Sequence, residues 1–185
     1  MKPIVLVDMD ETLNDMLPAF KKIAYEKGYM RNPYVEIKTW GLEDYLDASS
    51  FSKEQRIAMV DEIFCMDGFW YNLPLKPLAR NTIEIFSDKF DFYIATIPWW
   101  NSKTCLEEKK EWVRQVLPDF PLNKLLFCYP KHLINADYMI DDNPRILTEF
   151  PRKTIAMDYA YNRDIKANYR VRNWEEVFTL LYNIA

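Results

Sequence analysis

Short apolar runs separated by longer helical patterns dominate the chain. The runs lie at residues 4–7, 92–95, 125–128, 138–140 and 154–157. Turn-forming or polar residues bound each run, which is typical of strands buried on both faces of a parallel sheet. The pattern predicts an α/β fold with a doubly wound, Rossmann-like parallel sheet at its core.

Helical patterns fill the intervals between these runs, and the first interval is too long for a single crossover. It contains one apolar stripe that begins at Met16 and ends before Gly28, and a second that follows a capping box at Ser52–Gln55. Further helices are expected over residues 78–88 and 103–116, after Asn143-Pro144 and after Asn173. We therefore expect an α/β core of residues 1–14 and 78–185, with residues 15–77 forming a small helical cap inserted after strand 1.

Two of the expected helices have a readable apolar face. The helix after Ser52 is expected to bury one set of residues and the helix over 103–116 another. In the helix after Ser52, these residues are Ile57, Val60, Ile63 and Phe64. In the helix over 103–116, they are Leu106, Trp112, Val113 and Val116.

Residues suited to phosphate chemistry follow four of the apolar runs. Asp8 and Asp10 follow the first run, and Thr96 follows the second. Lys131 comes after the third run, and Asp141-Asp142 ends the fourth. Because the carboxyl ends of parallel strands meet at one edge of the sheet, we expect these side chains to converge in one crevice.

Asp8 and Asp10 carry the strongest chemical signal. In an extended strand, side chains at i and i+2 point the same way, so the two carboxylates would repel each other and one pKa would rise. A divalent cation relieves this repulsion, and Mg²⁺ suits a site of carboxylates, water and phosphate, to which Asp141 and Asp142 could add ligands. The plain alternative is a strand that ends in solvated, turn-forming acids.

Composition excludes several classes of protein. The chain has 185 residues, of which 49% are hydrophobic, so it can bury a substantial core. Its formal charge of -4 and pI near 5.2 give no positive field for a nucleic acid polymer. Three scattered cysteines, no signal peptide and no apolar stretch long enough for a membrane span predict a cytoplasmic protein with no membrane partner.

The series of Asp8, Asp10, Thr96, Lys131 and Asp141-Asp142 resembles the motifs of the haloacid dehalogenase-like (HAD) phosphohydrolases over the whole chain. The resemblance implies that Asp8 attacks phosphorus and that Asp10 acts as general acid and then general base. It also implies that Thr96 binds phosphoryl oxygens and that Lys131 offsets negative charge.

The same resemblance implies a Mg²⁺ site. The ion would be held by Asp8, the main-chain carbonyl of Asp10 and Asp142. Asp141 would be either a second ligand or a residue that orients lysine or water, and the sequence does not decide which of the two acids binds directly.

Within that superfamily the chain is similar to the 5'(3')-deoxyribonucleotidases. The similar pieces are Asp8-Met9-Asp10 with Leu13 and Asp15, Gly68-Phe69-Trp70, Thr96 with Pro98, Glu108-Lys109 before Trp112-Val113, Lys131 ahead of Ile140-Asp141-Asp142, and Tyr161-Asn162-Arg163. The chain departs from the family pattern at Glu11, where glycine is usual, at Ile97, where a hydroxyl residue is usual, and at Met16, where an aromatic is usual.

This similarity implies a substrate pocket between the cap and the core. Met16 and Ile97 fall at its expected entrance. Four aromatics, Trp40, Phe64, Phe69 and Trp70, are candidates to stack on a nucleobase, and the family pattern favours Phe64 and Phe69. Each of the four also fits a residue that holds a small cap together. Lys109 matches a family lysine but also fits an ordinary solvated helix residue.

The sequence thus predicts a Mg²⁺-dependent hydrolase of nucleoside monophosphates, by resemblance a 5'(3')-deoxyribonucleotidase. One alternative is a HAD-type phosphatase of another small phosphomonoester, such as a sugar phosphate. Another, which fits poorly because the acidic pair comes last and the cap would be unexplained, is a non-catalytic phosphoacceptor. Base and sugar preference, 5' or 3' position and oligomeric state, a homodimer being one option, are left open.

Overall fold

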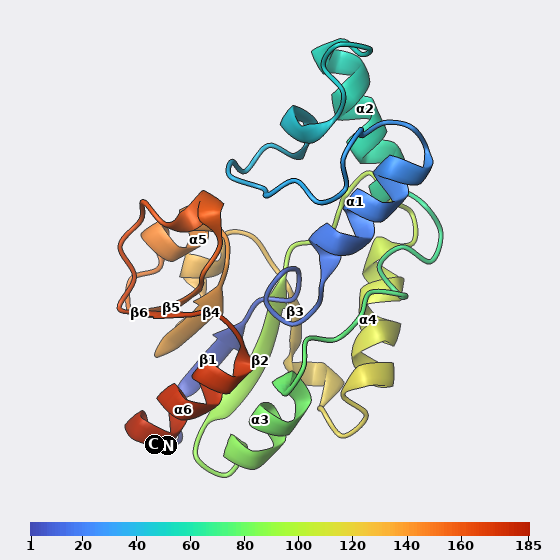
Figure 1. Ribbon diagram of the computed structural model, residues 1–185. Helices are drawn as coiled ribbons and strands as arrows, with labels where there is room; N and C mark the ends of the chain where they lie inside the picture. Colours follow the sequence, from blue (N-terminus) through green and yellow to red (C-terminus); the bar gives the residue numbers. More distant parts are fainter.

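A computed structural model describes residues 1–185, and its centre is one parallel sheet of six strands (Figure 1). The strand order is β3-β2-β1-β4-β5-β6, so the first strand lies in the middle of the sheet. The strands are β1 (Ile4–Val7), β2 (Asp91–Thr96), β3 (Leu125–Phe127), β4 (Tyr138–Asp141), β5 (Lys153–Met157) and β6 (Tyr169–Val171). The prediction of a doubly wound α/β fold is confirmed.

Helices and short 3-10 turns connect the strands. The α-helices are α1 (Met16–Glu26), α2 (Lys53–Phe64), α3 (Ala79–Phe86), α4 (Cys105–Val116), α5 (Pro144–Glu149) and α6 (Trp174–Ile184). The 3-10 turns are η1 (Leu42–Tyr45), η2 (Leu122–Lys124), η3 (Lys131–Leu133) and η4 (Ala160–Asn162). No helix is both long enough and apolar enough to cross a membrane.

Both faces of the sheet are covered, as its continuous apolar strands require. Val5 and Val7 point into the larger core, which also contains Trp112 from α4 and Trp174 from α6. Leu6 points to the other face, where a smaller cluster includes residues of α5. Successive residues of β1 therefore face two different layers.

The central position of β1 fixes where a ligand can bind. Val7 pairs with Ile94 of β2 on one side and with Ile140 of β4 on the other. The direction in which the strands are added reverses between β1 and β4, and such a switch point opens a crevice at the carboxyl ends of the strands. Asp8 and Asp141 therefore stand at the same level on neighbouring strands.

The segment between β1 and α3 begins and ends in two stretches that lie side by side. The Asp15 amide donates to the carbonyl of Pro74 at 3.0 Å, and the Lys76 amide donates to the carbonyl of Leu13 at 2.8 Å. Between them, α1 and α2 lie beyond the carboxyl ends of β1 and β2 (Figure 1). The expected capping box is present, with Ser52 and Gln55 bonding each other's backbone amides at the start of α2.

The structure corrects several details of the expected fold. The sheet has a sixth strand, β6, which the sequence pattern did not predict because three residues with Arg170 exposed give no apolar run. Strand β3 is only half-buried, since it lies at the edge of the sheet. Ile57 and Leu106 were expected on buried helix faces but are 50% and 42% exposed.

Candidate active site

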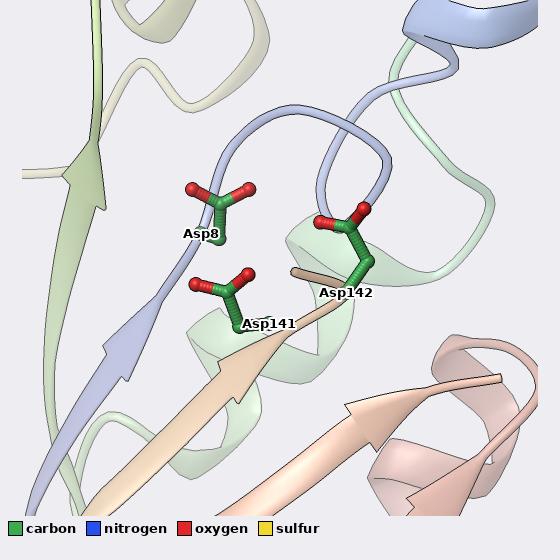
Figure 2. Close-up of side chains that lie close together, drawn as sticks. All are labelled: Asp8, Asp141 and Asp142. Carbon is green, nitrogen blue, oxygen red and sulfur yellow. The ribbon is translucent and has the colours of Figure 1, made fainter. Parts of the chain in front are cut away.

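Three aspartates meet where β1 and β4 end. A carboxylate oxygen of each of Asp8, Asp141 and Asp142 lies within 4.8 Å of those of the other two. Figure 2 shows Asp8 above Asp141, with Asp142 beside them on the chain that leaves β4. All three side chains are buried, so their mutual repulsion is weakly screened by solvent.

Lys131 neutralises part of this charge. It lies in η3, is 1% exposed, and its Nζ donates to Asp8 and, at 2.8 Å, to Asp141. Burial by itself lowers the pKa of this ammonium, but Asp141 and Asp8 outweigh burial and the pKa is raised. Lys131 is therefore charged across the physiological range, and it joins β1 to β4 at the sheet edge.

The remaining charge is not balanced by protein groups. The pKa of Asp8 is raised to about 7, because burial, to which Asp141 and Asp10 add, outweighs the opposing effect of Lys131. Burial also raises the pKa of Asp142, and Asp141 adds to the effect. Buried carboxylates that outnumber the ammonium groups beside them are the kind of site that a hard divalent cation stabilises.

Asp10 belongs to a second cluster, built around Lys109 of α4. The Nζ atom of Lys109 donates to Asp10, to Thr96 Oγ1 at 2.9 Å and to the Ile97 carbonyl at 3.2 Å. It also lies 4.5 Å from the centre of the Trp70 ring, within the range of a cation–π interaction. Lys109 thus joins the ends of β1 and β2 to the segment before α3.

Lys109 is fully buried. The sequence left open that it is a solvated lysine on the helix surface, and it is the most important residue for which that alternative was kept. The sequence of α4 contains a pattern that indicates the burial of Lys109. Cys105 lies four residues before it, and Trp112 and Val113 lie three and four residues after it, and all three are buried. A lysine on that stripe must find an anion inside the protein, because an unpaired buried charge is strongly unfavourable.

The loop after Asp10 carries further support for the site. Asn14 is fully buried, and its amide donates to Asp10 Oδ1 at 3.2 Å. Glu11 has a φ of 58°, a left-handed conformation that favours glycine, which explains why glycine is usual at this position. Here the Glu11 carboxylate accepts the amide hydrogen of Leu17, so it caps the first turn of α1.

A cavity of about 520 Å³ opens directly above the aspartates. Its wall includes the acids, Lys131, and four of the residues expected to bind substrate: Met16, Trp40, Phe64 and Ile97. Two expected residues are not part of the wall. Thr96 is fully buried beside Lys109, and Phe69 packs behind Phe64 with ring centres 5.3 Å apart.

Three further aromatic residues line the cavity: Trp70, which the sequence offered as a candidate to stack on a nucleobase, and Trp99 and Tyr161, which were not expected in the pocket. Trp70 and Trp99 each pack against Phe64, at 5.1 and 5.0 Å between ring centres. Tyr161 also lines the cavity, and its ring meets the ring of Trp40 in an edge-to-face arrangement with 5.5 Å between ring centres. The cavity therefore has a polar floor formed by the aspartates and Lys131, and apolar walls that contain several aromatic rings.

The fold is that of the HAD-like hydrolases. A HAD-like hydrolase from Streptococcus pneumoniae superposes with a TM-score of 0.62 at 16% identity, covering 97% of this chain and 98% of that one. A HAD hydrolase from Bacillus subtilis, determined with bound magnesium, gives a TM-score of 0.54 at 15% identity and covers 98% and 100% of the two chains. These likenesses establish the fold.

Sequence comparison identifies the family within that class. The model of the family described as "5' nucleotidase, deoxy (Pyrimidine), cytosolic type C protein" matches residues 2–185, and the chain belongs to this family. A 5'(3')-deoxyribonucleotidase of Clostridium acetobutylicum is 28% identical over 179 residues, which cover 97% of this chain and 94% of that protein. The resemblance inferred from the motifs is confirmed, and the protein is a phosphoric monoester hydrolase of nucleotidase type.

Proposed function

We propose that this protein is a Mg²⁺-dependent phosphatase that hydrolyses nucleoside monophosphates, with deoxyribonucleotides as its preferred substrates. The observation that carries the proposal is the meeting of four aspartates and the buried Lys131 on the floor of one cavity, with a second buried lysine, Lys109, bonded to Asp10 from outside the wall. The family match and the name of the clostridial relative support the nucleotide substrate.

Asp8 is the proposed nucleophile. A carboxylate oxygen of Asp8 attacks phosphorus, the bond from phosphorus to the ester oxygen breaks, and an aspartyl-phosphate forms. Asp10 gives its proton to the departing oxygen of the nucleoside. Lys131 contacts Asp8 and Thr96 shares a hydrogen bond with Lys109, so these groups can stabilise negative charge on the transferring phosphoryl group.

Water completes the proposed cycle. The Asp10 carboxylate takes a proton from a water molecule, whose oxygen attacks phosphorus while the bond to Asp8 breaks. Phosphate leaves, Asp8 is restored as a carboxylate and Asp10 is again protonated. Asn14 and Lys109 each hold one oxygen of Asp10, which fixes the direction from which it can exchange protons.

The donor set fits Mg²⁺. We propose that Asp8, the Asp10 carbonyl and Asp142 hold the ion, and that Asp141 orients Lys131, to which it is already bonded. When bound, Mg²⁺ would balance the carboxylates and polarise the phosphate. Four aspartates against two lysines leave two negative charges without a protein partner, which suits a divalent ion.

We also propose that residues 15–77 act as the cap that encloses the nucleoside, with Met16, Trp40, Phe64 and Ile97 on the substrate side and Phe69 as support behind Phe64. Aromatic walls favour a flat base over a hydrated sugar. A sugar phosphatase remains the second candidate, because the aspartates and Lys131 on the cavity floor would serve either substrate.

We also propose a cytoplasmic location, which the family's description as a cytosolic type supports.

A panel of monophosphates tests the substrate class. With saturating Mg²⁺, kcat/KM for pyrimidine and purine deoxyribonucleotides should exceed kcat/KM for glucose 6-phosphate and ribose 5-phosphate by about 100-fold or more, because only the former can use the aromatic walls. Phosphate release measures the rates. Comparable values across the panel would instead support the sugar-phosphate alternative.

Replacing Lys109 with methionine should lower kcat/KM for a nucleoside monophosphate by about 100-fold, because it removes a preorganised ammonium from Asp10 and Thr96. Methionine keeps most of the buried stem, so the far-ultraviolet circular dichroism should not change. Lys110→Met is the matched control, since Lys110 is its neighbour in α4 and bonds only Glu107. Wild-type activity in Lys109→Met would exclude this lysine from the mechanism.

A further inference from the structure

Asp142 is the one acid of the buried cluster that no lysine or arginine reaches. Lys131 bonds Asp8 and Asp141, and the side chain of Asp142 has a single hydrogen-bond partner, the hydroxyl group of Tyr161. The Tyr161 oxygen lies 2.6 Å from Asp142 Oδ2. The other carboxylate oxygen accepts no hydrogen bond, so it is available to a ligand in the cavity.

Tyr161 is itself held from two sides. Its ring stacks on Tyr159 with 5.2 Å between ring centres and an interplanar angle of 4°. The ring of Trp40, from the segment between β1 and α3, contacts the ring of Tyr161 edge-to-face, with 5.5 Å between ring centres. The Tyr159 hydroxyl group makes no bond to Asp142 and donates instead to the Glu11 carbonyl at 2.9 Å, so it is the stacked ring of Tyr159 that contacts Tyr161. The phenol of Tyr161 therefore has little freedom to turn away from Asp142.

The backbone of the same turn reinforces this placement. Asn162, which follows Tyr161 in η4, is fully buried, and its amide group donates to the carbonyls of Asp142 and Met157 at 2.7 Å each. In the bond between the two side chains, the Tyr161 hydroxyl group is the donor and the Asp142 carboxylate is the acceptor. Two neighbouring residues of the turn therefore bond Asp142: Asn162 bonds its main-chain carbonyl and Tyr161 bonds its side chain.

We propose that Tyr161 is a positioning residue for the metal site, holding Asp142 with one oxygen tied and the other presented to Mg²⁺. A hydrogen bond to the far oxygen of a ligating carboxylate fixes its orientation and removes freedom that binding would otherwise cost. The inference rests on the proposed Mg²⁺-dependent function and adds a residue to it that contacts neither the phosphate nor the ion.

The test compares Tyr161→Phe with Tyr159→Phe. Each variant loses one hydroxyl group and keeps the stacked pair, but only Tyr161→Phe releases Asp142. Titration calorimetry with MgCl₂ and no substrate should show a Kd raised about tenfold in Tyr161→Phe, the usual effect of removing a partner behind a metal ligand. Tyr159→Phe should bind Mg²⁺ with the wild-type Kd.

Kinetics provide the second readout. The Mg²⁺ concentration that gives half-maximal rate should rise about tenfold in Tyr161→Phe, while kcat at saturating Mg²⁺ stays within about twofold of wild type. An unchanged Kd in Tyr161→Phe, or an equal increase in both variants, would overturn the inference while leaving the proposed function intact. Failure of the wild-type protein to bind Mg²⁺ would overturn both.

Discussion

Replacing Asp8 with asparagine should lower phosphomonoester hydrolysis by a factor on the order of 10,000 or more, since the variant lacks the attacking carboxylate. The amide is nearly the same size, and Lys131 keeps its 2.8 Å bond to Asp141, so the fold should persist. Release of phosphate from p-nitrophenyl phosphate and from a deoxyribonucleotide measures the loss. Both substrates should lose activity, because both must pass through the same aspartyl-phosphate.

The control for this variant is Asp88→Asn, which makes the same chemical change at an exposed position after α3. It should keep wild-type activity. Circular dichroism and thermal unfolding should show that Asp8→Asn is folded. Hydrolysis at the wild-type rate in a folded Asp8→Asn protein would show that another group attacks phosphorus.

Removing divalent metal with EDTA should reduce turnover to below about 1% of its initial value, and excess MgCl₂ should restore it. The physical reason is that three carboxylates within 4.8 Å cannot bind a phosphate dianion while their charge is unbalanced. Activity before chelation, after chelation and after addition of MgCl₂ forms the measurement. Persistence of turnover in EDTA would contradict the metal assignment.

Thermal unfolding gives an independent measure of the same site. Mg²⁺ binds only the folded arrangement of Asp8, Asp141 and Asp142, so it should raise the Tm of the metal-free protein. The increase should grow with the Mg²⁺ concentration. Asp142→Asn, which removes one proposed ligand, should show a smaller increase at each concentration. An equal increase in the variant would show that Mg²⁺ stabilises the protein elsewhere.

The elements that the sequence predicted well depend on local signals. The capping box of Ser52 and Gln55 spans three residues, and Asn143 before Pro144 caps α5 through the two amides that follow. Strand β1 is an apolar run that needs a central place in the sheet, where both faces are covered. By contrast, β6 is short and partly exposed, and it pairs only with β5 at the edge of the sheet. Its formation depends on the neighbouring strand rather than on its own pattern.

The candidate active site also has features that the sequence predicted and features that it could not predict. The order of Asp8, Lys131 and Asp141 along the chain predicted their meeting, because parallel strands bring their carboxyl ends to one edge, while Thr96 bonds Lys109 beside them. Periodicity could not show whether an aromatic residue of the inserted segment faces substrate or its neighbours. Phe64 lines the cavity and Phe69 packs behind it, although both are buried and five residues apart.

The sequence alone thus determined the chemical groups at the strand ends, the fold that gathers them and the family to which the chain belongs. Tertiary structure decided which groups act together. Lys109 meets Asp10 across 99 residues of chain, and Tyr161 meets Asp142 across 19. A helical or strand pattern shows that such a side chain points inward, but its partner is set by how the elements pack, because hydrogen bonds form between groups that folding brings within about 3 Å.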